Sequence, residues 1–214
     1  NIEDLSLEHT IGREAGRAML SVLPHETMRL AVALERRGWR VVVEGKENHV
    51  GVVIALDGPS GSGKSTVSKK VAERLGLSYL DTGAMYRAVS WACMVDDVDM
   101  TSPDAMLERA RGAELLMGLD PTDPRVTVDG HDVTAAIREP VIADRVSAVA
   151  RVIPIRELLT GRMRNIIAAS GRIVAEGRDV TTVVWPTAQL RLLMVADPVE
   201  RIARREAELA GAAG

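Results

Sequence analysis

The sequence predicts an α/β fold in which helices flank a parallel sheet. Runs rich in β-branched and other apolar residues occur at residues 52–56, 172–176 and 189–196, as expected for buried strands. Apolar residues at helical spacing follow the first run. Alternating strands and helices are typical of a parallel sheet, because the chain must cross back to the same end of the sheet between parallel strands.

A domain is predicted at residues 51–214, and it begins with a strand followed by a helix. The strand at residues 52–56 leads into a helix that ends at Leu75, directly before a glycine. A short strand at residues 78–81 and a helix from Ala84 come next. The later strands then return the chain to the same sheet.

The interval at about residues 104–168 differs from this alternation. The Asp129-Gly130 pair separates two short β-branched runs, which is a signal for a two-residue hairpin turn. Helical patterns follow at residues 140–149 and 154–169, each with a proline near its first turn. We therefore expect an α+β insert within the domain.

Residues 1–46 precede this domain and end in a polar stretch suited to a linker. Their pattern predicts strands at residues 2–7, 18–23 and 39–43, with a helix at residues 28–34 before the last strand. We place a domain boundary after residue 46.

Composition narrows the class of protein. The net charge of −3, the absence of Phe and the presence of only two Tyr give no sign of a nucleic-acid-binding surface. No apolar stretch is long enough to cross a membrane, and the acidic first residues do not resemble a signal peptide. A single cysteine, Cys93, excludes an internal disulfide. We therefore expect a cytoplasmic protein, with Cys93 buried rather than nucleophilic.

A phosphate-binding loop is predicted after the first strand of the domain. The pattern G-x-x-x-x-G-K-[ST] lets the backbone bend so that its N–H groups point at phosphates. Lys64 would reach the β- and γ-phosphates of a nucleoside triphosphate, and the Ser65 hydroxyl would be a ligand to Mg²⁺. The predicted nucleotide-binding residues are Gly58, Pro59, Ser60, Gly61, Ser62, Gly63, Lys64, Ser65 and Thr66.

Two further segments leave a strand through a glycine. The first puts Thr82 and Arg87 near a helix N-terminus, where an anion is favoured, and the second ends in Arg178 and Asp179. The carboxyl ends of parallel strands meet at one edge of a sheet, so both arginines can face Lys64. The pattern predicts a second phosphate held for attack on the γ-phosphorus.

The region from about residue 52 to residue 209 resembles the bacterial cytidylate (CMP) kinases. The resemblance rests on three motifs in the right order, D-G-P-S-G-S-G-K-S-T, Y-L-D-T-G-A-M-Y-R and A-E-G-R-D-V-x-T-V-V-x-P. It implies the P-loop nucleoside monophosphate kinase fold, a monomeric kinase domain, and transfer of the γ-phosphoryl group of MgATP to CMP or dCMP. The implied catalytic residues are Lys64, Arg87 and Arg178.

The same resemblance implies an acceptor site. Arg87 and Arg178 would hold the CMP phosphate, and Thr82 and Tyr86 would line its pocket. The cytosine edge would meet groups from the insert and from the loop after residue 177. The amino group of cytosine suits Ser147 and Asp179, and its acceptor atoms suit Arg156. The implied acceptor-site residues are Thr82, Tyr86, Arg87, Ser147, Arg156, Arg178 and Asp179.

Some residues allow two interpretations, and one departs from the family pattern. Asp57 either supports the water shell of the metal or has a structural role at the end of its strand. Thr181 stands where the family usually has glycine. The arginines near the end of the sequence either form the base of a lid over ATP or lie on a solvated helix face; they are Arg201, Arg204 and Arg205.

The resemblance also describes the two ends of the sequence. The sequence stops at Gly214, before the family's lid and its last strand and helix, so we expect a C-terminally truncated domain with weak transfer. Residues 1–46 resemble the second half of the ACT regulatory domain of actinobacterial prephenate dehydrogenases, through the N-I-E-D opening and a helix ending in R-R-G-W. The alternative is an extension with no function of its own.

Two other functions remain compatible with these motifs. One is another P-loop kinase that acts on a nucleoside monophosphate or a small metabolite. The other is a non-catalytic nucleotide-binding regulatory module.

Overall fold

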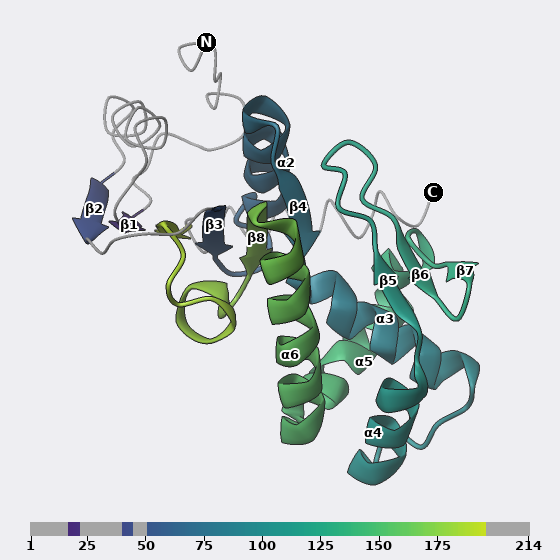
Figure 1. The fold of residues 1–214 in the computed structure, drawn as a ribbon. Helices are drawn as coiled ribbons and strands as arrows, with labels where there is room; N and C mark the ends of the chain where they lie inside the picture. Colours follow the sequence, from purple (N-terminus) through teal and green to yellow (C-terminus); the bar gives the residue numbers. More distant parts are fainter. Residues whose placement is uncertain (1–16, 22–39, 45–50, 196–214) are drawn as a thin grey trace.

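The computed structural model describes residues 17–21, 40–44 and 51–195. Its central sheet has four parallel strands in the order β4-β8-β3-β9 (Figure 1). They are β3 (Val52–Asp57), β4 (Ser78–Asp81), β8 (Arg172–Gly177) and β9 (Leu190–Leu193). The predicted α/β class with a parallel sheet is therefore confirmed.

The outer strand β9 is shorter than the predicted strand at residues 189–196. Gln189 lies outside β9, and its side-chain oxygen accepts a hydrogen bond from the backbone N–H of Val53 at 2.8 Å. This side-chain contact takes the place that a backbone carbonyl would have in the ladder. Residue 196 lies outside the described residues.

Helices cover both faces of the sheet, as predicted. The helices are α2 (Lys64–Leu75), α3 (Thr82–Val95), α4 (Pro103–Gly112), α5 (Pro140–Arg151) and α6 (Ile153–Ser170). Strand residues alternate between the faces: Val53 and Ile173 join the core under α3 and α6, whereas Ile54 and Val174 join the core under α2. The strand ends that carry the polar residues thus lie between two packed layers.

The structure begins α3 at Thr82, two residues before the predicted start. The Asp81 side chain caps the helix, because its Oδ1 accepts a hydrogen bond from the backbone N–H of Ala84 at 2.9 Å. A capped first turn lets the helix start directly at the strand end, which brings Thr82 and Arg87 to the edge of the sheet.

The insert contains the predicted hairpin and both predicted helices. Its antiparallel strands are β5 (Leu115–Met117), β6 (Val126–Val128) and β7 (His131–Asp132), and a short 3-10 helix, η3 (Ala136–Arg138), follows them. Asp129 and Gly130 both have positive φ, 50° and 80°, as a turn of this type requires. Sequence patterns did not indicate α4 or β5.

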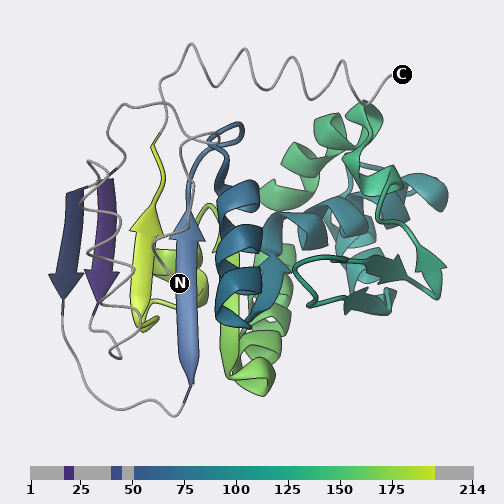
Figure 2. The same ribbon diagram turned by 90° about the horizontal axis from the view of Figure 1, so that it is seen from above.

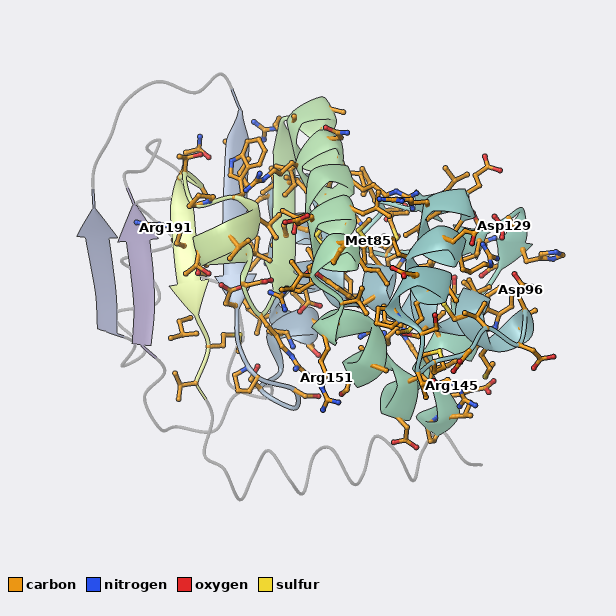
Figure 3. The ribbon with its side chains drawn as sticks, turned by 90° about the horizontal axis from the view of Figure 1, so that it is seen from below. Met85, Asp96, Asp129, Arg145, Arg151 and Arg191 are labelled. Carbon is orange, nitrogen blue, oxygen red and sulfur yellow. The ribbon has the colours of Figure 1, made fainter. Side chains whose placement is uncertain are left out.

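The hairpin packs on the small-residue face of α3. Ala84, Ala88 and Ala92 form a core with buried residues of the hairpin. At the periphery Arg109 of α4 forms ion pairs with Asp96 and Asp129, which lie close to each other in Figure 3. The insert is thereby joined to α3, the helix that carries Arg87.

Two more strands lie beside β9. The strands β1 (Arg17–Ser21) and β2 (Arg40–Glu44) pair in parallel with each other, and β1 runs next to β9 in the opposite direction (Figure 2). The predictions of strands near residues 18–23 and 39–43 are confirmed. The strand predicted at residues 2–7 and the helix predicted at residues 28–34 lie outside the described residues.

In the part of the chain that the structure describes, no helix is both long enough and apolar enough to cross a membrane.

Candidate active site

The phosphate loop joins β3 to α2 and has the backbone of an anion-binding turn. Gly61 and Gly63 have φ values of 74° and 81°, which residues with a side chain rarely adopt. Gly63 is the N-cap of α2 and offers no side chain to the first-turn N–H groups. The Ser62 hydroxyl is buried and has no hydrogen-bond partner among the described residues. The loop therefore presents donors that suit a phosphate.

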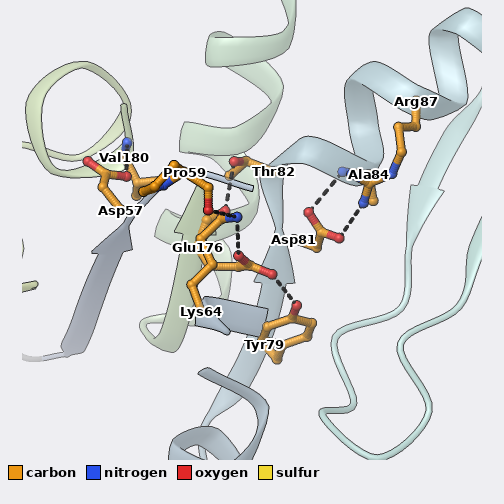
Figure 4. Close-up of polar contacts among 10 residues, drawn as sticks. All are labelled: Asp57, Pro59, Lys64, Tyr79, Asp81, Thr82, Ala84, Arg87, Glu176 and Val180. Carbon is orange, nitrogen blue, oxygen red and sulfur yellow. Dashed lines mark hydrogen bonds and ion pairs between the residues drawn. The ribbon is translucent and has the colours of Figure 1, made fainter. Parts of the chain in front are cut away.

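Lys64 lies between this loop and the end of β8. Its Nζ is 3.4 Å from the carbonyl oxygen of Pro59 and 3.8 Å from Oε2 of Glu176 (Figure 4). The Glu176 side chain is 1% exposed. A buried carboxylate thus holds the ammonium group at the mouth of the loop.

Tyr79 completes this buried group. Its hydroxyl donates a hydrogen bond of 2.7 Å to Oε1 of Glu176. Burial and the charge of Asp81 raise the pKa of Glu176, while Lys64 and the hydroxyls of Ser65 and Tyr79 lower it. Burial, followed by the charge of Glu176, raises the pKa of Tyr79 far above its usual range, so the phenol stays protonated and donates.

Sequence reasoning assigned no role to Tyr79 or Glu176. The available signal was Glu176 itself, a carboxylate at the end of an otherwise apolar strand, in register with Asp81 of β4. Tyr79 gave no signal, because an aromatic residue in a strand is ordinarily part of the core.

Arg87 is held by Asp81. Its Nη2 lies 2.5 Å from Oδ2 of Asp81, the same carboxylate that caps α3 (Figure 4). The Arg87 Nε is buried and has no partner within the described part of the chain. The guanidinium is therefore fixed at one end and keeps a donor for an anion. Sequence reasoning gave Asp81 no role, although an Asp at a strand-to-helix junction is a capping signal.

The Thr82 hydroxyl is committed to the backbone. Thr82 is buried, and its Oγ1 donates a hydrogen bond of 2.7 Å to the carbonyl oxygen of Glu176. This contact joins the start of α3 to the end of β8 and so holds the two acceptor-side segments together. Because the hydroxyl proton is used in this bond, Thr82 could line the predicted pocket but could not donate that proton to a substrate.

The structure brings together two of the predicted base-recognition residues and Tyr86, which was predicted to line the pocket. Arg156, in the first turn of α6, has its Nη2 2.9 Å from Oδ2 of Asp179. Burial and the nearby charge of Asp179 raise the pKa of the Tyr86 phenol, whereas the charge of Arg156 opposes the shift. Arg156, Asp179 and Tyr86 therefore share one neighbourhood at the junction of the insert and the sheet.

Two predicted residues have no contact of this kind. Arg178 directly follows the end of β8 and is exposed, without an ion pair to any described residue. Ser147 is exposed on α5, and no hydrogen bond links it to the other predicted residues within residues 51–195. The lid-base candidates Arg201, Arg204 and Arg205 lie outside the described residues.

Asp57 has a structural role at the end of its strand, which is one of the two alternatives for this residue. Its Oδ1 accepts a hydrogen bond from the backbone N–H of Val180 (Figure 4), and its Oδ2 accepts hydrogen bonds from Thr181. The side chain is buried at the end of β3. These bonds occupy both oxygens within the protein itself.

Comparison with known proteins names the family. The family model described as "Cytidylate kinase" matches residues 54–213, about three quarters of the chain. The chain belongs to the cytidylate kinase family. The match includes the phosphate loop, α3, the insert and the loop after β8, so every described site residue above lies within this kinase region.

Individual relatives agree with this assignment. The chain is 54% identical to a cytidylate kinase of Cutibacterium acnes over 161 residues, which are 74% of this chain and 71% of that protein. It is 48% identical to a cytidylate kinase of Streptomyces avermitilis over 162 residues, which are 75% of this chain and 70% of that protein.

A third relative places such a kinase region in a longer protein. The chain is 46% identical to a bifunctional pantoate ligase/cytidylate kinase of Prochlorococcus marinus (strain MIT 9303) over 158 residues. They are 73% of this chain and 32% of that protein. The predicted boundary after residue 46 and the ACT resemblance remain predictions.

Proposed function

We propose that this kinase transfers the γ-phosphoryl group of ATP to CMP or dCMP, giving ADP and the corresponding diphosphate. The observation that carries the choice of acceptor is the Arg156–Asp179 pair, with Nη2 and Oδ2 2.9 Å apart next to Tyr86. Donors and acceptors side by side suit the cytosine edge, which presents an amino group next to acceptor atoms. The relatives described above are cytidylate kinases, and this supports the same acceptor.

The donor side fits ATP and Mg²⁺. The uncapped first turn of α2 and the unpartnered hydroxyl of Ser62 suit the phosphates, and Lys64 adds a positive charge. Ser65 would be the protein's ligand to Mg²⁺, with Glu176 as the neighbouring carboxylate. The bound ion would supply charge neutralisation of the phosphates.

The acceptor phosphate would lie between Arg87 and Arg178. The Asp81 carboxylate orients Arg87, whose buried Nε still needs an acceptor. The exposed Arg178 can bend toward a phosphate at the same edge of the sheet. Two guanidinium groups lessen the repulsion between two phosphates that must approach each other.

The base would be recognised by the hydrogen-bonding atoms of Arg156 and Asp179 that their mutual ion pair does not use. The pair engages one oxygen of Asp179 and one nitrogen of Arg156, so within the described part of the chain Oδ1 and further N–H groups remain for the base. Tyr86 would provide an apolar wall from α3, and Ser147 a hydroxyl from α5. The acceptor base therefore meets residues from both the sheet and the insert.

The transfer itself needs no protein nucleophile. An oxygen of the acceptor phosphate attacks the γ-phosphorus and forms the new P–O bond, while the bond to the oxygen bridging the β- and γ-phosphorus breaks and its electron pair leaves with ADP. Lys64, Arg87 and Arg178 stabilise the negative charge that shifts between these oxygens. Positioning and charge thus account for the catalysis that the protein provides.

A phosphorylation screen tests this proposal. The protein would be incubated with MgATP and, separately, CMP, dCMP, UMP, AMP and shikimate, and the products separated by chromatography. CMP or dCMP should be the preferred acceptor. Preference for AMP or shikimate would identify another P-loop kinase, and binding of ATP with no product from any acceptor would identify a non-catalytic module.

Lys64→Ala provides the matched test of the loop. Loss of the charge at the γ-phosphate should lower kcat by about 100-fold or more, in the range known for removal of one charge-stabilising group. Lys70→Ala changes an exposed lysine on the same helix, outside the loop, and should keep normal turnover. Equal turnover in the Lys64→Ala variant and the wild type would contradict the assigned role.

A further inference from the structure

Asp57 connects the phosphate-loop strand to the turn that follows Asp179. It is the last residue of β3, directly before Gly58, and is 3% exposed. Its Oδ1 accepts a hydrogen bond of 2.8 Å from the backbone N–H of Val180. Its Oδ2 accepts two more, from the backbone N–H of Thr181 at 2.9 Å and from the Thr181 hydroxyl at 2.5 Å. These hydrogen bonds therefore connect the end of β3 to a turn that lies 124 residues later in the sequence.

The C-terminal end of the same turn is hydrogen-bonded to the insert. The turn, η4 (Val180–Val184), is a single π-helical turn. Arg164 of α6 donates hydrogen bonds to the carbonyl oxygens of Val183, at 2.7 Å, and Val184, at 3.0 Å. Arg178 and Asp179 therefore enter a turn that is held by the donor-side strand at one end and by the insert at the other.

The Thr181 hydroxyl is the side-chain part of this connection. A hydrogen bond from a hydroxyl to a buried carboxylate is stronger and shorter than one between neutral groups. The two backbone bonds would form with any residue at position 181, apart from proline, whereas the hydroxyl bond depends on the side chain. It also fixes the rotamer of a β-branched residue that follows Asp179 by only two positions.

We propose that Thr181, through Asp57, is a positioning residue for the acceptor nucleotide. It holds Arg178 and Asp179 in the arrangement that receives the acceptor phosphate and base, in fixed relation to the phosphate loop. The proposal rests on the proposed function of this site as a nucleotide phosphotransferase. Neither Thr181 nor Asp57 would itself touch a substrate.

The test compares Thr181→Val with Thr181→Ser and Thr182→Val. Valine keeps the shape of threonine without the hydroxyl, and serine keeps the hydroxyl. Thr182 is the adjacent exposed threonine, whose hydroxyl lies only at the limit of hydrogen bonding, 3.5 Å from the Asp179 carbonyl oxygen. Thr181→Ala serves as a second variant in case valine is not accommodated beside the buried carboxylate.

Steady-state kinetics would be measured with ATP and with whichever acceptor the wild type prefers. Thr181→Val and Thr181→Ala should raise KM for the acceptor by about five- to tenfold and leave KM for ATP within about twofold. Thr181→Ser and Thr182→Val should resemble the wild type. Equal rises in both KM values, or an effect of Thr182→Val as large as that of Thr181→Val, would overturn the proposal.

Hydrogen exchange gives a readout that does not depend on turnover. Amides of residues 178–184 should exchange faster in Thr181→Val than in the wild type or in Thr182→Val, because the hydrogen bond from the Thr181 hydroxyl to Asp57 is lost. Unchanged exchange would overturn the proposal even if the kinetics changed. If the screen finds another preferred acceptor, the proposed function fails while the positioning role is judged on that acceptor's KM.

Discussion

At the scale of single residues, the site depends on buried polar atoms that have few possible hydrogen-bond or ion-pair partners. Glu176 serves Tyr79 with one carboxylate oxygen and Lys64 with the other. Asp81 likewise divides its two oxygens between the start of α3 and Arg87. Because the contacts of each pair use different oxygens, removing one partner should leave the contact to the other oxygen in place. This makes conservative variants informative.

Tyr79→Phe should destabilise the protein without enlarging or emptying its core. It removes only the hydroxyl that bonds to Glu176, and the loss of a hydrogen bond to a buried charged group costs about 1–3 kcal/mol. Urea unfolding would measure the loss. Ser90→Ala is the control and should cost less than about 0.5 kcal/mol. Among the described residues, the buried Ser90 hydroxyl bonds only to the Tyr86 carbonyl oxygen of its own helix. Equal losses in both variants would contradict a special role for the Tyr79 hydroxyl.

Asp81→Asn should impair binding of the acceptor in particular. Asparagine can still cap α3 but loses the charge that holds Arg87. KM for CMP should rise by about tenfold, with KM for ATP nearly unchanged. Asp96→Asn removes a charge from the Arg109 pair beyond the other end of α3 and should leave both KM values unchanged. A rise in KM for ATP alone would contradict the assignment of Arg87 to the acceptor.

At the scale of elements, short polar contacts hold the hairpin of the insert against α4. The Oδ1 of Asp129 accepts a hydrogen bond of 2.8 Å from the backbone N–H of Glu114, and its Oδ2 lies 2.5 Å from Nη2 of Arg109. The bond from Glu114, followed by Arg109, lowers the pKa of Asp129 below its usual value. The ionised carboxylate is therefore the form that stabilises the fold.

The pH dependence of stability should reveal this contact. Because the pKa of Asp129 is lower in the folded state, its contribution is fully present above the ordinary Asp pKa and is lost as pH falls through the folded pKa. Asp129→Asn tolerates the positive φ and should cost about 0.5–1 kcal/mol at pH 7, a modest value because the side chain is 39% exposed. The difference from the wild type, measured by urea unfolding, should shrink toward zero as the pH falls below the ordinary Asp pKa and through the lower folded pKa. A difference that stays constant with pH would contradict the electrostatic origin.

At the scale of the whole molecule, the sheet separates two cores and brings the polar strand ends to one edge. One core lies under α2, and the other contains α3, α5 and α6. Cys93 belongs to the second core and is fully buried, as predicted from its apolar neighbours. Burial also raises the pKa of its thiol. Its reactivity therefore reports opening of this core.

The single thiol should react slowly in the native protein. A raised pKa lowers the thiolate fraction at neutral pH, and burial blocks access of the reagent. Reaction with a thiol reagent at pH 8 should be roughly 100-fold or more slower in buffer than in urea, since it must await opening of the core. ATP and CMP together should slow it further by stabilising the folded state. Rapid native reaction would contradict this packing of α3.

The sequence by itself determined the parts of this protein that depend on local spacing. The phosphate loop at residues 58–66, the Asp129-Gly130 turn and the helices that begin with proline all follow from the allowed backbone angles of a few adjacent residues. The placement of Arg87 and Asp179 at one edge of the sheet also followed, because parallel strands end on the same side.

Only the tertiary structure decided which polar groups meet. The bond from Tyr79 to Glu176 joins residues 97 positions apart, and the bond from Thr181 to Asp57 joins residues 124 positions apart. Both contacts require that β8 lie between β4 and β3, an order that no local pattern encodes. The partner of a buried charge is set by strand order and register, since desolvation makes such a charge depend on whichever group the fold places beside it.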